Sequence, residues 1–143
     1  MKTLLALTII AGLATTSHAE VWRCLYKGTW TEAKTKTSSK MDLLLDWTAK
    51  DEHWELVGDL NDSGGHSWFD GTCDDSFCTL VQTYKSGSNK GKKYFYSGSF
   101  TNTPIEDDED HLKNKIHGTW GYSKESNTDG GKWDLAATCK RKS

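Results

Sequence analysis

Apolar and polar residues alternate along most of the chain. Trp133 and Leu135, for example, are separated by Asp134 and preceded by Lys132, and no stretch carries apolar residues at helical spacing. A period of two is typical of a β-strand that buries one face, and clusters of Gly, Asn, Asp and Ser separate the alternating segments. The pattern predicts an all-β protein with strands over residues 21–31, 39–48, 53–60, 66–73, 77–85, 92–102, 113–122 and 131–140.

Eight short antiparallel strands joined by short loops favour a small up-and-down β-barrel, because closing the sheet removes its exposed edges. A two-sheet β-sandwich is the alternative. Five glycines lie midway between large apolar residues or a cysteine, on the face predicted to point inward. A glycine inside a strand usually marks a bulge, a sharp bend at a barrel corner or the close approach of another group. It also leaves space among large aromatic side chains, and the five positions fit the coiling of a small barrel. The five are Gly28, Gly58, Gly71, Gly98 and Gly118.

The first residues are typical of a secretory signal peptide. Lys2 is followed by an apolar run over residues 4–13 and by the small-residue end Ser17-His18-Ala19, which predicts cleavage after Ala19. The apolar run is too short for a membrane span. We therefore expect an exported protein, periplasmic or secreted, whose residues 20–143 form a single barrel domain.

Four cysteines, all after residue 19, predict two disulfides in an oxidising compartment. Three pairings are possible, and we favour a local Cys73–Cys78 bridge with a Cys24–Cys139 bridge across the seam where the first and last strands meet. Zinc is the rival interpretation, but the cysteines lack the paired spacing of a zinc ribbon.

The chain is also unusually aromatic, with seven tryptophans and five tyrosines. Most of them fall on the inward register, whereas Trp68 is out of step and is predicted to lie outside. One interpretation is a barrel mouth that accepts a small apolar or aromatic ligand; the other is a filled aromatic core. The candidate ligand-binding residues are Trp30, Trp47, Trp54, Trp120, Trp133 and Tyr96.

Gly28-Thr29-Trp30 in the first predicted strand resembles the G-x-W motif of the lipocalins and the GTW of the avidins, both calycin-type barrels. The resemblance implies a ligand site at the open end of the barrel, and it transfers only Gly28 and Trp30. The later lipocalin motifs, the helix after the last strand and the biotin-contacting pattern of avidins are not present. The likeness is therefore one of architecture.

Charged residues gather in two predicted loops. The loop over residues 103–112 carries Glu106, Asp107, Asp108, Glu109 and Asp110, and the other carries Lys90, Lys92 and Lys93. Such loops steer oppositely charged partners, which gives an alternative function: a protein-binding module, such as an inhibitor or immunity protein of an extracytoplasmic enzyme. A solvated acidic loop or a calcium site are other interpretations, although the glycine-punctuated spacing of a calcium loop is missing.

The remaining composition predicts no catalysis. The chain has a formal charge of −2 at pH 7, so neither nucleic acid nor an anionic membrane is an expected partner. His53, His66, His111 and His117 show no metal-ligand spacing, and no nucleophile, base and orienting residue can be assembled from motifs. We expect a monomeric, non-enzymatic binding protein without a cofactor or metal.

Overall fold

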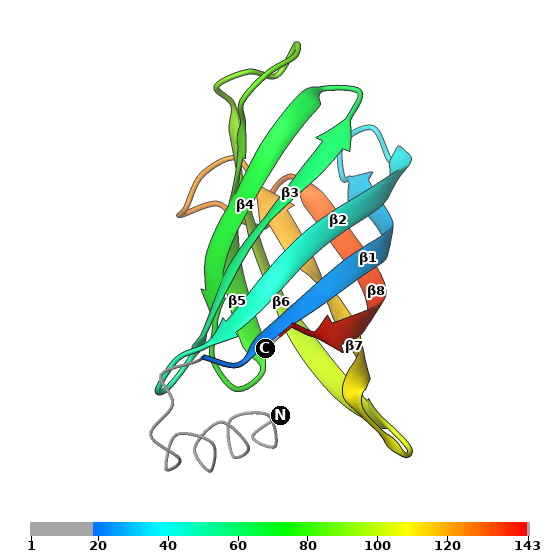
Figure 1. The fold of residues 1–143 in the computed structure, drawn as a ribbon. Coiled ribbons are helices and arrows are strands. Elements are labelled where there is room, and N and C mark those ends of the chain that lie inside the picture. Colours follow the sequence, from blue (N-terminus) through cyan, green and yellow to red (C-terminus); the bar gives the residue numbers. More distant parts are fainter. Residues whose placement is uncertain (1–18, 143) are drawn as a thin grey trace.

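The computed structural model describes residues 19–142, and these form a closed antiparallel barrel of eight strands (Figure 1). Each strand pairs with the next along the chain, and the last pairs with the first, so the predicted barrel is confirmed and the sandwich is not formed. The predicted signal peptide lies outside the described residues except for Ala19. The strands are β1 (Val21–Glu32), β2 (Ser38–Ala49), β3 (Trp54–Asp62), β4 (Gly65–Cys73), β5 (Phe77–Tyr84), β6 (Lys93–Ile105), β7 (Asp108–Gly121) and β8 (Gly131–Arg141).

The seam between β1 and β8 carries the predicted long-range disulfide. Cys24 and Cys139 lie directly opposite each other in the antiparallel register and are bonded, as are Cys73 and Cys78 at the turn between β4 and β5. Both bridges were expected from the sequence. Disulfides are typical of oxidising compartments, in agreement with a location outside the cytoplasm.

The inward-facing side chains form one continuous core of large residues, as the period-two pattern predicts. The five interior glycines allow neighbouring strands to approach closely. A β-carbon built on Gly118 would lie 1.9 Å from the carbonyl oxygen of Ser97, and one on Gly58 would lie 1.8 Å from that of Leu44. The close approach of a neighbouring backbone, one of the roles expected for these glycines, is therefore observed.

The prediction of an acidic loop over residues 103–112 is wrong. Strand β6 continues to Ile105 and β7 begins at Asp108, so only Glu106 and Asp107 form the turn of a long hairpin. Asp107 adopts a positive φ of 61°, a conformation that Asp tolerates better than most residues. This part of the hairpin lacks the apolar alternation from which strands were predicted.

The two ends of the barrel differ. We call the end with the β2–β3, β4–β5 and β6–β7 turns the closed end, and the other end the mouth. At the closed end Trp47 packs edge-to-face on Trp54 and Phe100, with ring centroids 6.1 and 4.9 Å apart. Both disulfides lie here, and the cavity that remains between these side chains measures only about 10 Å³.

The barrel wall opens between β2 and β3 on the mouth side. Their register runs from the Ala49–Trp54 pair to the Leu44–Asp59 pair. Among the described residues, no pairing between these two strands continues beyond Leu44 and Asp59, and the strands diverge (Figure 1). A groove of about 330 Å³ lies at this divergence, lined by residues such as Leu25, Leu44 and Asn61.

Residues 19–142 contain no helix of the length and apolarity needed to cross a membrane.

Candidate functional site

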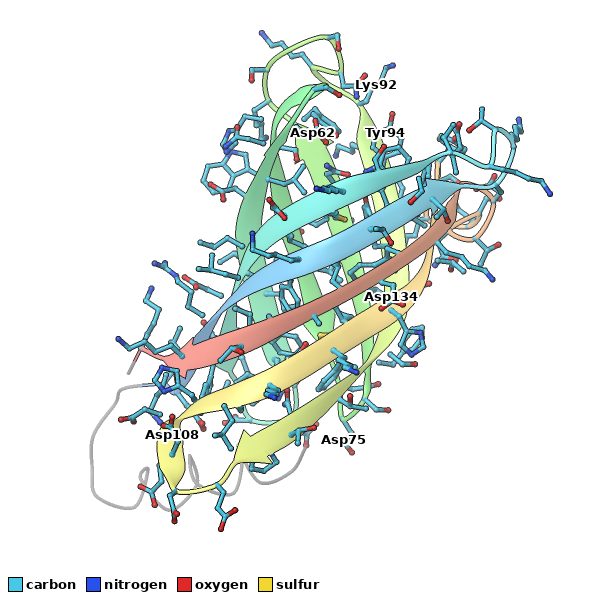
Figure 2. The ribbon with its side chains drawn as sticks, turned by 90° about the vertical axis from the view of Figure 1, so that its right-hand side faces the viewer. Asp62, Asp75, Lys92, Tyr94, Asp108 and Asp134 are labelled. Carbon is cyan, nitrogen blue, oxygen red and sulfur yellow. A yellow bond between two sulfur atoms is a disulfide. The ribbon has the colours of Figure 1, made fainter. Side chains whose placement is uncertain are left out.

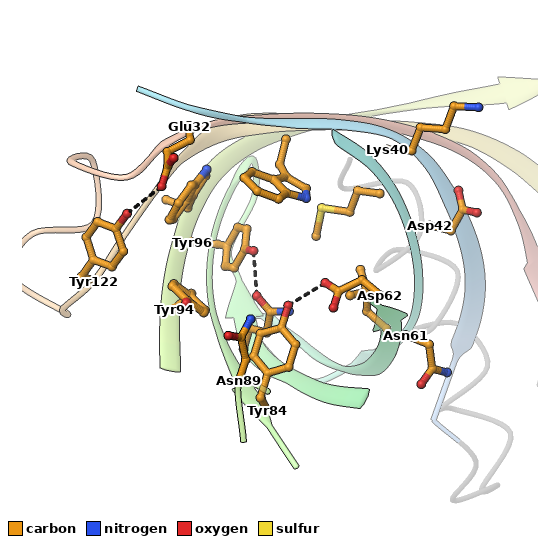
Figure 3. Close-up of a pocket in the computed structure, with 15 residues that line it drawn as sticks. Glu32, Lys40, Asp42, Asn61, Asp62, Tyr84, Asn89, Tyr94, Tyr96 and Tyr122 are labelled. Atoms are coloured by element: carbon orange, nitrogen blue, oxygen red, sulfur yellow. Dashed lines mark hydrogen bonds between the residues drawn. The ribbon is translucent and has the colours of Figure 1, made fainter. Parts of the chain in front are cut away.

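A pocket of about 140 Å³ occupies the mouth of the barrel (Figure 3). This volume is comparable with that of apolar protein cavities that hold a benzene ring, about 150 Å³. Every strand except β4 and β8 contributes to its wall. The lining residues are Trp30, Glu32, Lys40, Met41, Asp42, Leu60, Asn61, Asp62, Gln82, Tyr84, Asn89, Tyr94, Tyr96, Trp120 and Tyr122.

One side of the pocket is a continuous aromatic wall. Trp120 lies edge-to-face against Trp30, Tyr94 and Tyr122, with ring centroids 5.8, 5.8 and 5.5 Å apart. Tyr94 continues the series to Tyr84 at 6.0 Å. Edge-to-face contacts of this kind stabilise a ring cluster beyond the burial of its area. The indole N–H of Trp120 donates to the backbone carbonyl of Thr31, which fixes the central ring.

Polar groups lie at the floor of the pocket. The Tyr96 hydroxyl donates to Oε1 of Gln82 at 2.8 Å, and Nε2 of Gln82 donates to the Ser67 hydroxyl at 2.9 Å. Gln82 and Ser67 are buried. Beneath them Trp133, only 1 % exposed, packs on Tyr96 with centroids 5.2 Å apart and separates the pocket from the closed end.

Two carboxylates stand over the aromatic wall at the rim. Glu32 and Asp62 are the last residues of β1 and β3, and each lies two residues beyond an inward-facing residue, Trp30 or Leu60. Asp62 accepts a hydrogen bond of 2.6 Å from the Tyr84 hydroxyl. Figure 3 shows Asp62 directed into the opening and Glu32 at the rim beside Tyr122, whose hydroxyl donates to it at 3.4 Å.

The tyrosines of the pocket are held as neutral phenols. Burial is the main cause that raises the pKa of Tyr84, Tyr94 and Tyr122. The negative charge of a nearby carboxylate raises these pKa values further: Asp62 acts on Tyr84, Glu32 on Tyr122, and both act on Tyr94. The pocket therefore lies in the field of two carboxylates that disfavours additional negative charge.

The structure separates the predicted ligand-binding residues into two groups. Trp30, Trp120 and Tyr96 line the mouth pocket. Trp47 and Trp54 instead pack at the closed end, and Trp133 fills the middle of the barrel with its indole N–H bonded to the Ser97 carbonyl. Trp68 is 47 % exposed on the outer surface, as predicted.

The two charged segments lie at opposite ends of the molecule. Lys90 and Lys92 belong to the loop between β5 and β6 at the mouth, with Lys93 at the start of β6, whereas Glu106 to Asp110 lie on the β6–β7 hairpin at the closed end. Lys92 and Asp108 mark these ends in Figure 2. The two segments therefore do not form one continuous surface, and the protein-binding alternative stays a prediction for each segment by itself.

Several pocket residues were missed by the sequence reading because the search for inward positions considered apolar residues. Gln82 and Tyr84 follow Leu80 at two-residue steps along β5, and Glu32 follows Trp30 in the same way on β1. Their register was thus readable. Their height along the barrel axis, which places them in the mouth, was not.

The histidines do not converge. His66, His111 and His53 each lie near one carboxylate, those of Asp59, Asp108 and Glu55 respectively. Within residues 19–142 no group of three or more His, Cys, Asp or Glu side chains is arranged to hold a metal ion.

Comparison of the chain with protein families, with curated proteins and with solved structures finds no significant match.

Proposed function

We propose that the protein is an exported, non-enzymatic binding protein that holds a small organic ligand in the mouth pocket. The observation that carries this proposal is the contrast between the two ends of the barrel. The closed end is packed with rings and leaves about 10 Å³, while the mouth leaves about 140 Å³ between aromatic residues. A concave, mainly apolar pocket with a few convergent polar groups is the usual form of a small-molecule site.

The pocket offers a ligand both contact area and orientation. Trp30 and Trp120 supply flat apolar surfaces, and the hydroxyls of Tyr84 and Tyr96 and the amide of Gln82 supply hydrogen-bonding groups at fixed positions. Tyr96 is bonded to Gln82 and Tyr84 to Asp62, so these groups are ordered before a ligand arrives. Preorganisation of this kind reduces the entropy that binding loses.

Native mass spectrometry of protein purified without denaturation from its own cells tests the proposal. We expect an additional mass of a few hundred daltons that is lost on denaturation. Trp120→Phe, which replaces an indole of the aromatic wall by a smaller ring, should retain less of the bound ligand. Trp68→Phe makes the same replacement on the outer surface and should retain the ligand fully. A bare protein mass, or a mass that matches a second protein, would contradict the proposal.

A further inference from the structure

We infer that the ligand of the mouth pocket is a small organic cation: a protonated or quaternary amine attached to an apolar body about the size of one ring. This inference rests on the proposed function, since it names the chemical class of the ligand that the pocket would hold. It is carried by the combination of an aromatic wall with two rim carboxylates, each placed by strand register.

The first step is the position of the charges. Glu32 and Asp62 continue the inward registers of β1 and β3 and line the pocket at its rim, where Glu32 is half-buried and Asp62 is exposed. Lys40 and Asp42 also border the pocket, but they flank the buried Met41 and therefore lie on the outward register of β2. Figure 3 shows both of them directed away from the opening. The charge that faces the ligand is therefore negative.

The second step is the aromatic wall. Trp30 and Trp120 are nearly perpendicular, with an interplanar angle of 87°, and Tyr94 and Trp120 meet at 83°. Perpendicular rings direct their faces to different sides of the pocket. The face of an aromatic ring attracts a cation within about 6 Å, most strongly for tryptophan. Rings and carboxylates thus favour the same charge on a ligand.

The third step concerns the hydrogen-bonding capacity that remains at the rim. Asp62 accepts from the Tyr84 hydroxyl through Oδ2 and from the backbone N–H of Gly64 through Oδ1. A carboxylate has about four acceptor sites, so Asp62 keeps room for an ammonium donor while the two bonds hold it in place. An ion pair with hydrogen bonds is stronger than a bond between neutral groups.

The lysines of the mouth end do not reverse this preference. Apart from Lys40, no lysine of the described residues lines the pocket. The lysines of the mouth loops and of the start of β6 are all exposed: Lys34, Lys36, Lys85, Lys90, Lys92, Lys93 and Lys124. Charges on exposed loops are screened by water and salt over about 8 Å at physiological ionic strength. Glu32 and Asp62 line the pocket itself, so a bound ligand lies much closer to these two carboxylates than to the lysines of the loops.

The test compares three compounds with the same ring and similar chains but different head charge: phenethylamine, 2-phenylethanol and 3-phenylpropionate. Isothermal titration calorimetry at pH 7 and low salt measures their affinities. We expect the amine to bind at least about tenfold more tightly than the alcohol, and the carboxylate to bind most weakly, because a charge-assisted bond and the ring faces both act on the cation.

Variants identify the groups responsible. Asp62→Asn and Glu32→Gln should each weaken amine binding by roughly five- to tenfold and leave alcohol binding unchanged. The double variant should bind amine and alcohol within about twofold of each other. Asp134→Asn is the matched control, since Asp134 lies on the outer surface of β8 (Figure 2); it should leave all three affinities unchanged.

The outcomes separate this inference from the proposed function. If the alcohol or the carboxylate binds as tightly as the amine, or if the Asp134 variant acts like the Asp62 variant, the inference is wrong and the pocket still binds small molecules. A retained native ligand that has no cationic group would likewise contradict the inference and leave the proposed function standing. If none of the three compounds binds with a Kd below about 10 mM, and native mass spectrometry finds no retained ligand, both proposals fail.

Discussion

Removal of the two disulfides should have very different effects on stability, although both bridges lie at the closed end. In the chain-entropy description, a bridge stabilises the fold by restricting the unfolded chain, and its effect grows with the length of the loop that it closes. Cys24–Cys139 spans 115 residues and Cys73–Cys78 spans 5. The corresponding contributions at 25 °C are about 4.8 and about 2.1 kcal/mol.

The comparison is well controlled because all four cysteines are at most 2 % exposed. Alanine is the suitable replacement, since a buried serine would leave its hydroxyl in need of a partner. We therefore expect Cys24→Ala/Cys139→Ala to lose about 2.7 kcal/mol more than Cys73→Ala/Cys78→Ala. A loss of this size is a large part of the total stability of an ordinary domain, about 5–15 kcal/mol.

Equilibrium unfolding in urea, followed by tryptophan fluorescence, measures both losses. The variant without the long-range bridge should also show a larger m-value, because its unfolded state exposes more surface. If the local bridge proves as important as the long-range one, loop closure does not govern the stability of this barrel. Strain or packing at the β4–β5 turn would then have to explain the result.

Three further predictions concern backbone packing and pH. Gly118→Ala should destabilise the fold by about 2 kcal/mol or more, because the new β-carbon would lie 1.9 Å from the Ser97 carbonyl oxygen. Chemical denaturation measures this change in stability, and an unchanged free energy of unfolding would contradict it. Arg23 donates two hydrogen bonds to Asp46 and lowers the pKa of that carboxyl. The pair thus stabilises the fold above about pH 4 and ceases to do so as the pH falls through the lowered pKa, so Asp46→Asn should cost about 1 kcal/mol at pH 7 and nothing near pH 2. All five tyrosines have raised pKa values, chiefly through burial. The folded state therefore favours the neutral phenols, and the stability that this adds is complete below about pH 10 and is lost as the pH rises further. In an alkaline titration, the absorbance of the phenolate form should therefore rise mainly as the protein unfolds. If most of this rise came before unfolding, the raised tyrosine pKa values would be wrong.

The sequence was sufficient for the fold because its strongest signal, the period-two alternation, reports directly on which face of a strand is buried. Cys24 and Cys139 could be paired from that signal, since both lie on the inward register of the strands that meet at the seam. The acidic hairpin was missed for the same reason. Residues such as Asp108 and Asp110 carry no apolar alternation, and their strand forms through pairing with its neighbours.

The site was only partly predictable. Trp30 and Trp54 have the same inward register, yet Trp30 lines the mouth and Trp54 packs at the closed end. Alternation gives the face of a strand, whereas the location of empty space depends on how side chains from eight strands fill each level. The volumes of neighbouring side chains in three dimensions decide this, and one strand does not contain that information.

The opening between β2 and β3 gives the two ends of the barrel unequal stiffness. Both covalent bridges hold the closed end, whereas the strand edges beyond Leu44 and Asp59 can separate further without loss of a ladder hydrogen bond between them. Backbone amide hydrogens along these edges should exchange with solvent far faster than those at the closed end. The rim can therefore widen while the floor of the pocket keeps its shape. Such a pocket would select strictly for the part of a molecule that reaches the floor and tolerate variation in the part that emerges through the wall.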